Sequence, residues 1–343
     1  MSSEKKVISS DLISIIVPAY NSEKSIGRMI QSLVTQKDVD IEIVIVDDAS
    51  TDNTLSVVRG LSEKDSRIKV LAHDKNKGAH LARAYGLKES KGKYIGFADA
   101  DDYVRSDMYK KLLFYIKKTN SCIAVCSVGM VNESGKKLKF SPKFRRGRVI
   151  EEGFLNDLMM SRLGQPYLWN KLYCREAVSY AFSFEYPWRQ SLNEDMIVNI
   201  ACFYKARRVC ILSDVLYFYL KNPSSVVRSA TRADRYVEHI KAFAIALAFY
   251  GGLSEEMRSL VYKYYRDYIS RKSFFIEDVL ELDRLSNEMD KVILYLNEID
   301  RFALIRLCAR SNDIRARGKS LRVRANGFID KYILKRNIYE YIK

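Results

Sequence analysis

Histidine, proline and glycine are scarce in this sequence of 343 residues, which contains three, five and fifteen of them respectively. The few prolines and glycines are spread without a period, which argues against a disordered chain or a repeat protein. The histidines are too scattered to form a zinc framework, and no C-x-x-C pair is present. The six cysteines lie mostly within apolar stretches, which predicts buried free thiols in a reducing cytosol rather than disulfides.

Long uncharged apolar runs are also absent. No run reaches the roughly 18–20 residues that a membrane-spanning helix needs, and the longest candidate, 242–253, contains Gly251-Gly252. The first twenty residues lack the long apolar segment and the small-residue cleavage site of a signal peptide. We therefore expect a cytoplasmic protein that is soluble, or at most peripheral on the inner face of the cell membrane.

Positive charge is abundant but unevenly placed. The net charge is +16, and residues 301–343 hold twelve Lys and Arg against three acids. A second basic cluster, 136–148, contains no acid. Three interpretations are open for this surface: it binds anionic lipid headgroups, it binds nucleic acid, or it is simply a solvated basic face.

Aspartates follow two apolar runs. The run 41–46 (IEIVIV) precedes Asp47-Asp48, and the run 94–98 (YIGFA) precedes Asp99-Ala100-Asp101-Asp102. Both runs have the pattern of buried parallel strands, whose carboxyl ends form the ligand crevice in open α/β sheets. Clustered acids repel one another unless a cation neutralises them. A divalent metal carrying the diphosphate of a nucleotide-sugar is the simplest ligand for such a cluster.

Strand and helix patterns alternate through the first hundred residues, which predicts an α/β fold with a doubly wound, mostly parallel sheet. The segment after 132–135 is expected to form a hairpin arm or a loop. After residue 228, strand signals fade and amphipathic helical patterns dominate. We therefore predict a catalytic domain over 1–228 and a basic, α-helical C-terminal domain over 229–343.

Five motifs occur in a characteristic order: 17–21 (VPAYN), Asp47-Asp48-x-Ser-x-Asp, Asn76-x-Gly78 with Ala82-Arg83, Asp99-x-Asp101-Asp102, and Asn193-Glu194-Asp195. Together they resemble the family 2 glycosyltransferases of GT-A fold, over residues 12–228. The resemblance implies an inverting enzyme that transfers a sugar, a hexose or an N-acetylhexosamine, from a UDP-sugar.

The resemblance also implies a set of donor contacts. Those around the base and ribose are Pro18, Tyr20, Glu23 and Asp48, and Asp48 would accept from the N3–H of uracil. Asn76 and Arg83 match the family's base and diphosphate contacts. An alternative for Arg83 is an exposed helix residue. For the acids of the second motif the alternative is helix capping, which we accept for Asp52.

The D-x-D motif is expected to hold ribose and metal. By resemblance Asp99 binds the ribose, Ala100 lies between the two acids, and Asp101 binds Mn²⁺ or Mg²⁺ that stabilises the departing UDP. We expect Asp102 to cap the following helix. Many relatives supply a histidine ligand late in the catalytic domain, whereas the three histidines here (His73, His80 and His239) lie before or beyond that place.

The acceptor side is expected to contain the base. By resemblance Asp195 takes the proton of the acceptor hydroxyl and Glu194 supports the acceptor or the sugar. The alternative is two first-turn acids that complement a helix dipole. Trp169 and Lys171 lie in a segment similar to one near the family's acceptor channel, although Trp169 could equally be a core residue.

The C-terminal helices either pack as a subdomain, or dock on anionic membrane and bring the site to a lipid-diphosphate-linked acceptor. The resemblance implies a role in building a surface polysaccharide such as capsule, O-antigen, exopolysaccharide or teichoic acid. The alternatives are another transferase on the same nucleotide-binding fold, or a basic protein that binds nucleic acid or membrane. No nucleic-acid-binding motif is recognisable, so we expect no nucleic-acid partner. Whether the chain forms an oligomer is left open.

Overall fold

The computed structural model describes residues 11–132, 137–140, 144, 147–159, 163, 166–221, 231–271 and 286–300. The chain divides into two compact units: the first comprises Met1–Glu185 and Glu194–Pro223, and the second Tyr186–Asn193 and Ser224–Lys343. The domain boundary predicted at 228–229, and residues 301–343 of the predicted helical domain, lie outside the described residues.

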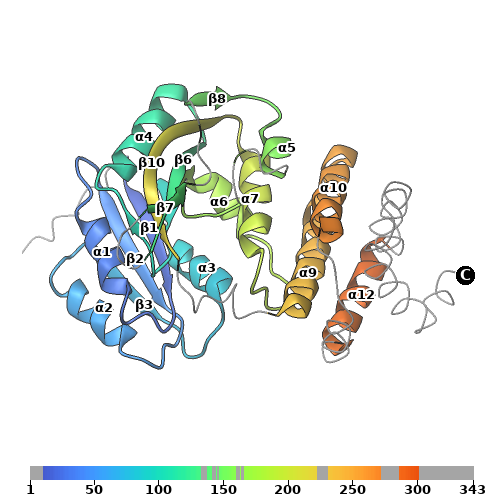
Figure 1. Cartoon of the computed structure of the whole chain (residues 1–343), viewed down its shortest axis with the longest axis horizontal. Helices are drawn as coiled ribbons and strands as arrows, with labels where there is room; N and C mark the ends of the chain where they lie inside the picture. The colour runs from blue at the N-terminus through green and yellow to red at the C-terminus, as the bar shows by residue number, and fades with distance from the viewer. Residues whose placement is uncertain are drawn as a thin grey trace, which may run out of the picture. The chain divides into compact units, whose positions relative to one another are not determined.

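A single sheet runs through the first unit (Figure 1). Its strands follow the order β3-β2-β1-β4-β9-β6-β10-β5, with β7 beside β6 and β8 beside β10. The strands are β1 Ile13–Ala19, β2 Ile41–Asp47, β3 Ile68–Ala72, β4 Tyr94–Phe97, β5 Tyr103–Val104, β6 Ile123–Val131, β7 Lys137–Phe140, β8 Arg148–Ile150, β9 Lys171–Cys174 and β10 Val209–Leu220.

Parallel pairing dominates, as the sequence predicted. Strands β1 to β4 form one parallel block and β6 pairs in parallel with β10. Strand β9 lies antiparallel between β4 and β6 and joins the two parallel parts. The predicted hairpin is confirmed for the described residues, because β7 pairs antiparallel with β6. The α/β fold class is therefore confirmed.

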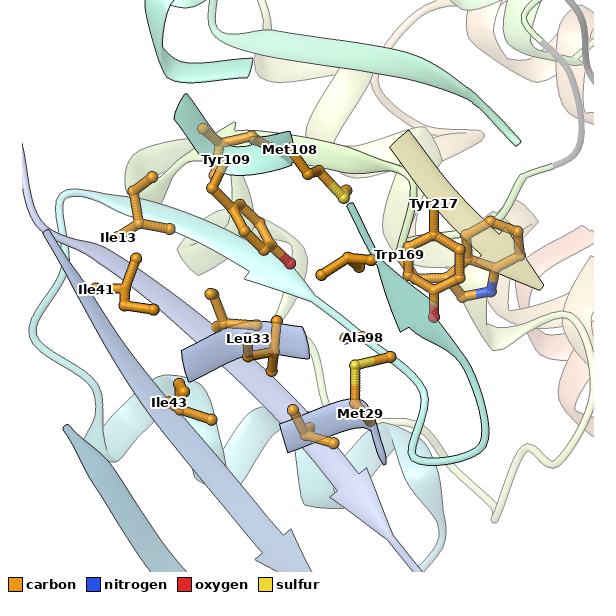
Figure 2. Close-up of a cluster of buried hydrophobic side chains, with 14 of the residues drawn as sticks. Ile13, Met29, Leu33, Ile41, Ile43, Ala98, Met108, Tyr109, Trp169 and Tyr217 are labelled. Carbon is orange, nitrogen blue, oxygen red and sulfur yellow. The ribbon is translucent and has the colours of Figure 1, made fainter. Parts of the chain in front are cut away.

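Helices cover both faces of this sheet, in agreement with the alternating pattern. The helices described in this unit are α1 Ile26–Val34, α2 Thr54–Ser62, α3 Ala79–Glu89, α4 Met108–Thr119, α5 Phe154–Met159, α6 Arg175–Ala181 and α7 Glu194–Lys205; α5 packs on α7. One face of β1 packs with α1 and α4 in a common core, where Ile13, Met29, Leu33 and Tyr109 are buried (Figure 2). Because side chains alternate along a strand, Ile16 points to the other face, against α3.

Parallel pairing fixes where the strands end. In the register of β1 and β2, Ala19 lies opposite Asp47, and Ile16 of β1 lies opposite Phe97 of β4. The segments that leave β1, β2 and β4 therefore emerge at the same edge of the sheet. This edge is where the motif residues were expected to meet.

The second unit is helical where it is described. Helix α9 (Arg232–Tyr250) begins with a capping box between Thr231 and Asp234, and it contacts α10 (Glu255–Arg271) and α12 (Ser286–Asp300). Phe243 of α9 packs edge-on against Tyr262 and Tyr265 of α10. Within the described residues, none of the helices is both long enough and apolar enough to cross a bilayer.

Two helical glycines give a matched test of the packing between α3 and the sheet. A Cβ on Gly86 would lie 2.5 Å from Ile16 Cγ2 and 3.2 Å from Val46 Cγ2, whereas a Cβ on Gly60 in α2 meets nothing within 4 Å. We expect Gly86→Ala to destabilise the protein by about 1–3 kcal/mol through overpacking. Gly60→Ala should stabilise it by about 0.5–1 kcal/mol through helix propensity. Urea denaturation checks both, and equal effects would contradict the close approach of α3.

Candidate active site

Asp48 fixes the loop that follows β3. Its carboxylate is buried and accepts hydrogen bonds from the backbone N–H groups of Lys77 (2.9 Å) and Gly78 (2.7 Å). His73 Nδ1 lies 2.7 Å from the same carboxylate and donates to it, because an ionised carboxylate only accepts. Gly78 has a φ of 93°, which a residue without a Cβ adopts readily. Asn76, the expected base contact, therefore lies in a loop whose shape Asp48 holds.

The segment after β1 is tied to the start of α2. The Glu23 carboxylate accepts from the backbone and side-chain nitrogens of Asn53, at 3.0 Å each. Asp52 accepts from the backbone N–H groups of Glu23 (3.1 Å) and Thr54 (3.0 Å). Asp52 thus binds backbone at the start of α2, as predicted, although Asn53 occupies the N-cap position. Glu23, expected near the nucleotide, has its carboxylate bonded to Asn53.

Three further donor contacts expected from the sequence differ in their exposure. The ring of Tyr20 is 48% exposed directly after β1, so it is accessible to a ligand. Pro18 is partly buried within β1, and Ala100 is 7% exposed in the turn after β4. The position and exposure of Tyr20 suit a ring that covers a flat nucleotide base.

The turn after β4 is tied to β10. The Asp99 N–H donates to the Tyr217 hydroxyl (3.1 Å), which in turn donates to the Asp102 carboxylate (2.8 Å). Asp102 also accepts from the Leu220 N–H (2.7 Å) and is fully buried. The prediction that Asp102 caps the next helix is wrong, because its carboxylate is bonded to β10 instead. This contact holds the D-x-D motif in place.

Arg83 of α3 joins the two groups of acids. Its side chain is 4% exposed, with Nη2 at 3.1 Å from Asp99 and Nη1 at 3.1 Å from Asp195 and 3.2 Å from Glu194. The alternative of an ordinary exposed helix residue is therefore wrong. A single guanidinium contacts both the D-x-D turn and the first turn of α7, which the chain separates by about a hundred residues. Sequence spacing alone did not predict this bridge.

Burial changes the proton affinity of these groups. Burial and the neighbouring Asp195 raise the pKa of Glu194 to about 8, against the pull of Arg83. Burial also raises the pKa of Asp195, and Arg83 opposes this shift. For Arg83, burial alone would lower the pKa, but the three carboxylates raise it overall. A carboxylate with a raised pKa is suited to take a proton near neutral pH.

Trp169 and Lys171 lie inside the protein. Trp169 is 2% exposed and stacks between Tyr167 (4.4 Å) and Tyr217 (4.2 Å); its ring lies beside that of Tyr217 in Figure 2. Lys171 is fully buried, and its Nζ donates to the Tyr167 carbonyl and to Asn170 Oδ1. This burial corrects the prediction that the two residues contact an acceptor, since neither side chain reaches the surface. For Trp169, the core alternative is supported.

The acids at the sheet edge suit a metal ion that arrives with its substrate. Among the described residues, no group of three His, Cys, Asp or Glu side chains is placed to hold a metal ion. His73 contacts Asp48, and His80 is buried against Phe182 with a pKa that burial lowers to about 3. Mg²⁺ and Mn²⁺ keep several waters and use substrate phosphates beside one or two carboxylates. Asp101, in the turn after β4, could supply the one protein carboxylate that such an ion needs.

Sequence comparison identifies the family. The profile described as "Glycosyl transferase family 2" matches residues 14–179. The uncharacterized glycosyltransferase EpsJ of Bacillus subtilis is 33% identical over 245 residues, which cover 70% of this chain and 70% of that protein. The chain belongs to glycosyltransferase family 2. The enzyme class expected from the five motifs is thereby confirmed.

Other relatives of this family 2 glycosyltransferase come from Staphylococcus aureus. The poly(ribitol-phosphate) beta-N-acetylglucosaminyltransferase TarS is 28% identical over 209 residues, which cover 60% of this chain and 35% of TarS. The crystal structure of TarS 1–349 in complex with UDP-GlcNAc aligns with a TM-score of 0.66 at 21% identity, over 94% of this chain and 92% of that one. The complex with UDP aligns with a TM-score of 0.64 at 20% identity, over 96% and 92%. These likenesses show a shared GT-A fold.

Two residues of the site escaped the sequence interpretation. His73 contacts Asp48, but a single histidine after a short strand carries no recognisable pattern. Tyr217 connects Asp99 to Asp102 from β10, and its only signal is its place in an aromatic strand, LYFYL. Both contacts are made between segments that are distant in sequence. They became visible only with the fold.

The proton affinity of Glu194 predicts how stability depends on pH. An unfolded glutamate titrates near 4.5 and the folded one near 8, so between these values the folded state keeps a proton that the unfolded state releases. Raising the pH from about 5 to 8 should therefore remove stability that Glu194 contributes to the ligand-free enzyme, whereas His80 and Lys171, whose pKa values burial lowers, add slopes of the opposite sign. We expect the melting temperature of Glu194→Gln to rise relative to that of the wild type as the pH increases, because the amide does not titrate, and the difference between exposed Glu63→Gln and the wild type to stay constant. An unchanged slope in Glu194→Gln would contradict the shifted pKa.

Proposed function

We propose that this enzyme transfers a sugar from a UDP-sugar to a hydroxyl of a glycan or lipid-linked acceptor, with inversion and with the help of a divalent metal. The observation that carries the proposal is the Arg83 bridge, which holds Asp99 on the donor side and Asp195 on the acceptor side at 3.1 Å each from one guanidinium. This bridge supports a site at which donor-binding and proton-accepting groups would meet one sugar.

Several features support UDP as the nucleotide. TarS 1–349 has been crystallised in complex with UDP and with UDP-GlcNAc. Here Asp48 accepts three hydrogen bonds from the protein, and a carboxylate has about four acceptor positions. One position is left for the N3–H of uracil, and the exposed ring of Tyr20 lies on the neighbouring strand end.

The metal would be held by Asp101, with the diphosphate and water as its other ligands. When bound, such a cation stabilises the negative charge that develops on the departing diphosphate. Asp99, beside it, would bind the ribose. Arg83 would keep the two acidic segments at a fixed separation while the diphosphate binds.

Asp195 is the proposed base. In the reaction the bond between the anomeric carbon and the diphosphate oxygen breaks, and UDP leaves with the electron pair. The acceptor oxygen forms the new bond to the anomeric carbon, and its proton passes to the Asp195 carboxylate. Glu194, whose pKa burial raises to about 8, would bind a hydroxyl of the sugar or acceptor.

The acceptor is proposed from the relatives. TarS is a poly(ribitol-phosphate) beta-N-acetylglucosaminyltransferase by name. This likeness supports a polymer or a lipid-linked acceptor in surface polysaccharide assembly. An N-acetylhexosamine is the first sugar to test, because UDP-GlcNAc is named as a ligand of TarS. We further propose that the basic C-terminal segment docks on an anionic membrane surface; residues 301–343, which carry most of its charge, lie outside the described residues.

The nucleotide and base assignments have separable tests. Calorimetry should show UDP binding that is tighter with Mn²⁺ than with EDTA, and stronger than binding of GDP, CDP or TDP. We expect Asp101→Asn to remove the metal dependence. Asp195→Asn should retain UDP binding but lower transfer from UDP-GlcNAc by about 10²–10⁴-fold, as loss of a general base does.

Asp38→Asn is the matched control, since this side chain is 71% exposed and paired with Lys110 on the surface. It should bind UDP and turn over like the wild type. Full turnover by Asp195→Asn would refute the base assignment. Absence of binding for all four nucleotides would refute the donor proposal.

A further inference from the structure

The turn before β9 is held by an unusual set of buried polar contacts. Lys171 Nζ donates to the Tyr167 carbonyl and, at 2.8 Å, to Asn170 Oδ1. The Asn170 side chain donates to the Cys126 carbonyl (2.9 Å), and the Cys126 N–H donates back to the Asn170 carbonyl (3.0 Å). A fully buried lysine is costly unless its ammonium is hydrogen-bonded. Here Lys171 Nζ bonds to Tyr167 and Asn170 across the turn, and Asn170 fixes the turn to β6.

The same turn contacts the proposed base. The backbone N–H of Leu168 favours the ionised form of the Asp195 carboxylate and so lowers its pKa. Asn199, one helical turn beyond Asp195, donates to the Pro166 carbonyl (2.7 Å) and to the Asp195 carbonyl (2.8 Å). Asn199 therefore joins the turn to the first turns of α7 beside the base. The Lys171 charge also interacts with the Asp195 carboxylate.

The other side of the turn reaches the D-x-D motif. Trp169 stacks on Tyr217 with ring centroids 4.2 Å apart. The Tyr217 hydroxyl accepts from the Asp99 N–H and donates to Asp102. The turn thus contacts the acceptor side through its backbone and the donor side through one aromatic ring.

We propose that Lys171 is a positioning residue for proton transfer: it closes the 166–170 turn so that the Leu168 N–H and a buried positive charge hold the Asp195 carboxylate ready for the acceptor. This inference rests on the proposed function, because it assigns Asp195 as the base. It differs from the acceptor contact predicted from the sequence, since Lys171 acts through another residue and touches no substrate.

Several charged groups around Asp195 decide the sign of the expected pH effect. Arg83 of α3 and Lys171 of β9 stabilise the carboxylate, whereas Asp99 disfavours its ionised form and Glu194 is the neighbouring acid on α7. Burial lowers the pKa of Lys171 to about 7, so its charge is present below neutral pH. Removing that charge should raise the pKa of Asp195 and move the acidic limb of the rate profile to higher pH.

Two substitutions separate the roles of Lys171. Lys171→Met removes both the donors and the charge, whereas Lys171→Gln removes the charge but keeps N–H donors on a shorter side chain. The control is Lys88→Met, because Lys88 is exposed on α3. The probe is UDP release from UDP-GlcNAc with Mn²⁺ over pH 5–9, together with calorimetric binding of UDP and the melting temperature.

For Lys171→Met we expect kcat to fall by about 10–100-fold, part of the full effect of a general base, while the affinity for UDP stays within about threefold. The acidic limb should move up by about one pH unit in both Lys171 variants and not in Lys88→Met. In an Asp195→Asn background, Lys171→Met should cost little more, because the two residues act in one step.

A wild-type enzyme that releases no UDP from UDP-GlcNAc or any other UDP-sugar would refute the proposed function itself. With an active wild type, unchanged kcat and pH profile in both variants would refute only the role of Lys171. Loss of UDP binding in both variants would also overturn it, because Lys171 would then support the whole unit rather than the base. If Lys171→Met lowered kcat equally in the wild-type and the Asp195→Asn backgrounds, the role of Lys171 would likewise be refuted.

Discussion

A guanidinium buried among three carboxylates is the interaction on which this site depends. Arg83 is 4% exposed and contacts Asp99, Glu194 and Asp195. Without the cation these acids would repel one another in a medium where charge is poorly screened. The guanidinium offsets this repulsion, while burial raises the pKa of Glu194 and of Asp195. Asp101, in the same turn as Asp99, adds to the negative charge that a divalent cation could neutralise.

The rest of the first unit serves to bring these charges together. Parallel pairing of β1, β2 and β4 places the motif segments at one edge. Asp102 is buried and fixes the turn after β4 to β10 through the Leu220 N–H and the Tyr217 hydroxyl. Asp48 fixes the loop after β3 through two backbone N–H groups, in addition to its proposed contact with the base. Some acids of the motifs therefore support the site as well as, or instead of, binding a ligand. Binding and support are divided between neighbouring residues of the same motif.

Much of the fold could be predicted, because the signals are local. The apolar positions of α1 at 26, 29, 30 and 33 are all buried, as their helical spacing indicates. The parallel strands followed from continuous apolar runs. The corrections concern contacts that no local pattern encodes: Asp102 binds β10, and Lys171 and Trp169 turn inward. The pattern Trp-Asn-Lys predicts that this segment lies close to the site. Which of its side chains face a ligand depends on how β9 enters the sheet.

Strand β9 has a consequence for how the sheet can open locally. It pairs Tyr173 with Ile95 of β4 on one side and with Ile123 of β6 on the other, and it thereby joins the β1–β4 block to β6 and β10. Its pairing with β4 covers three residues, from Tyr94 to Gly96, whereas β1 and β2 pair along the whole of both strands. Because short pairings have few hydrogen bonds to break, we expect partial opening to begin at β9. Such an opening would free the turn beside Asp195 while the β1–β4 block stays folded, so the two sides of the site can lose their order separately.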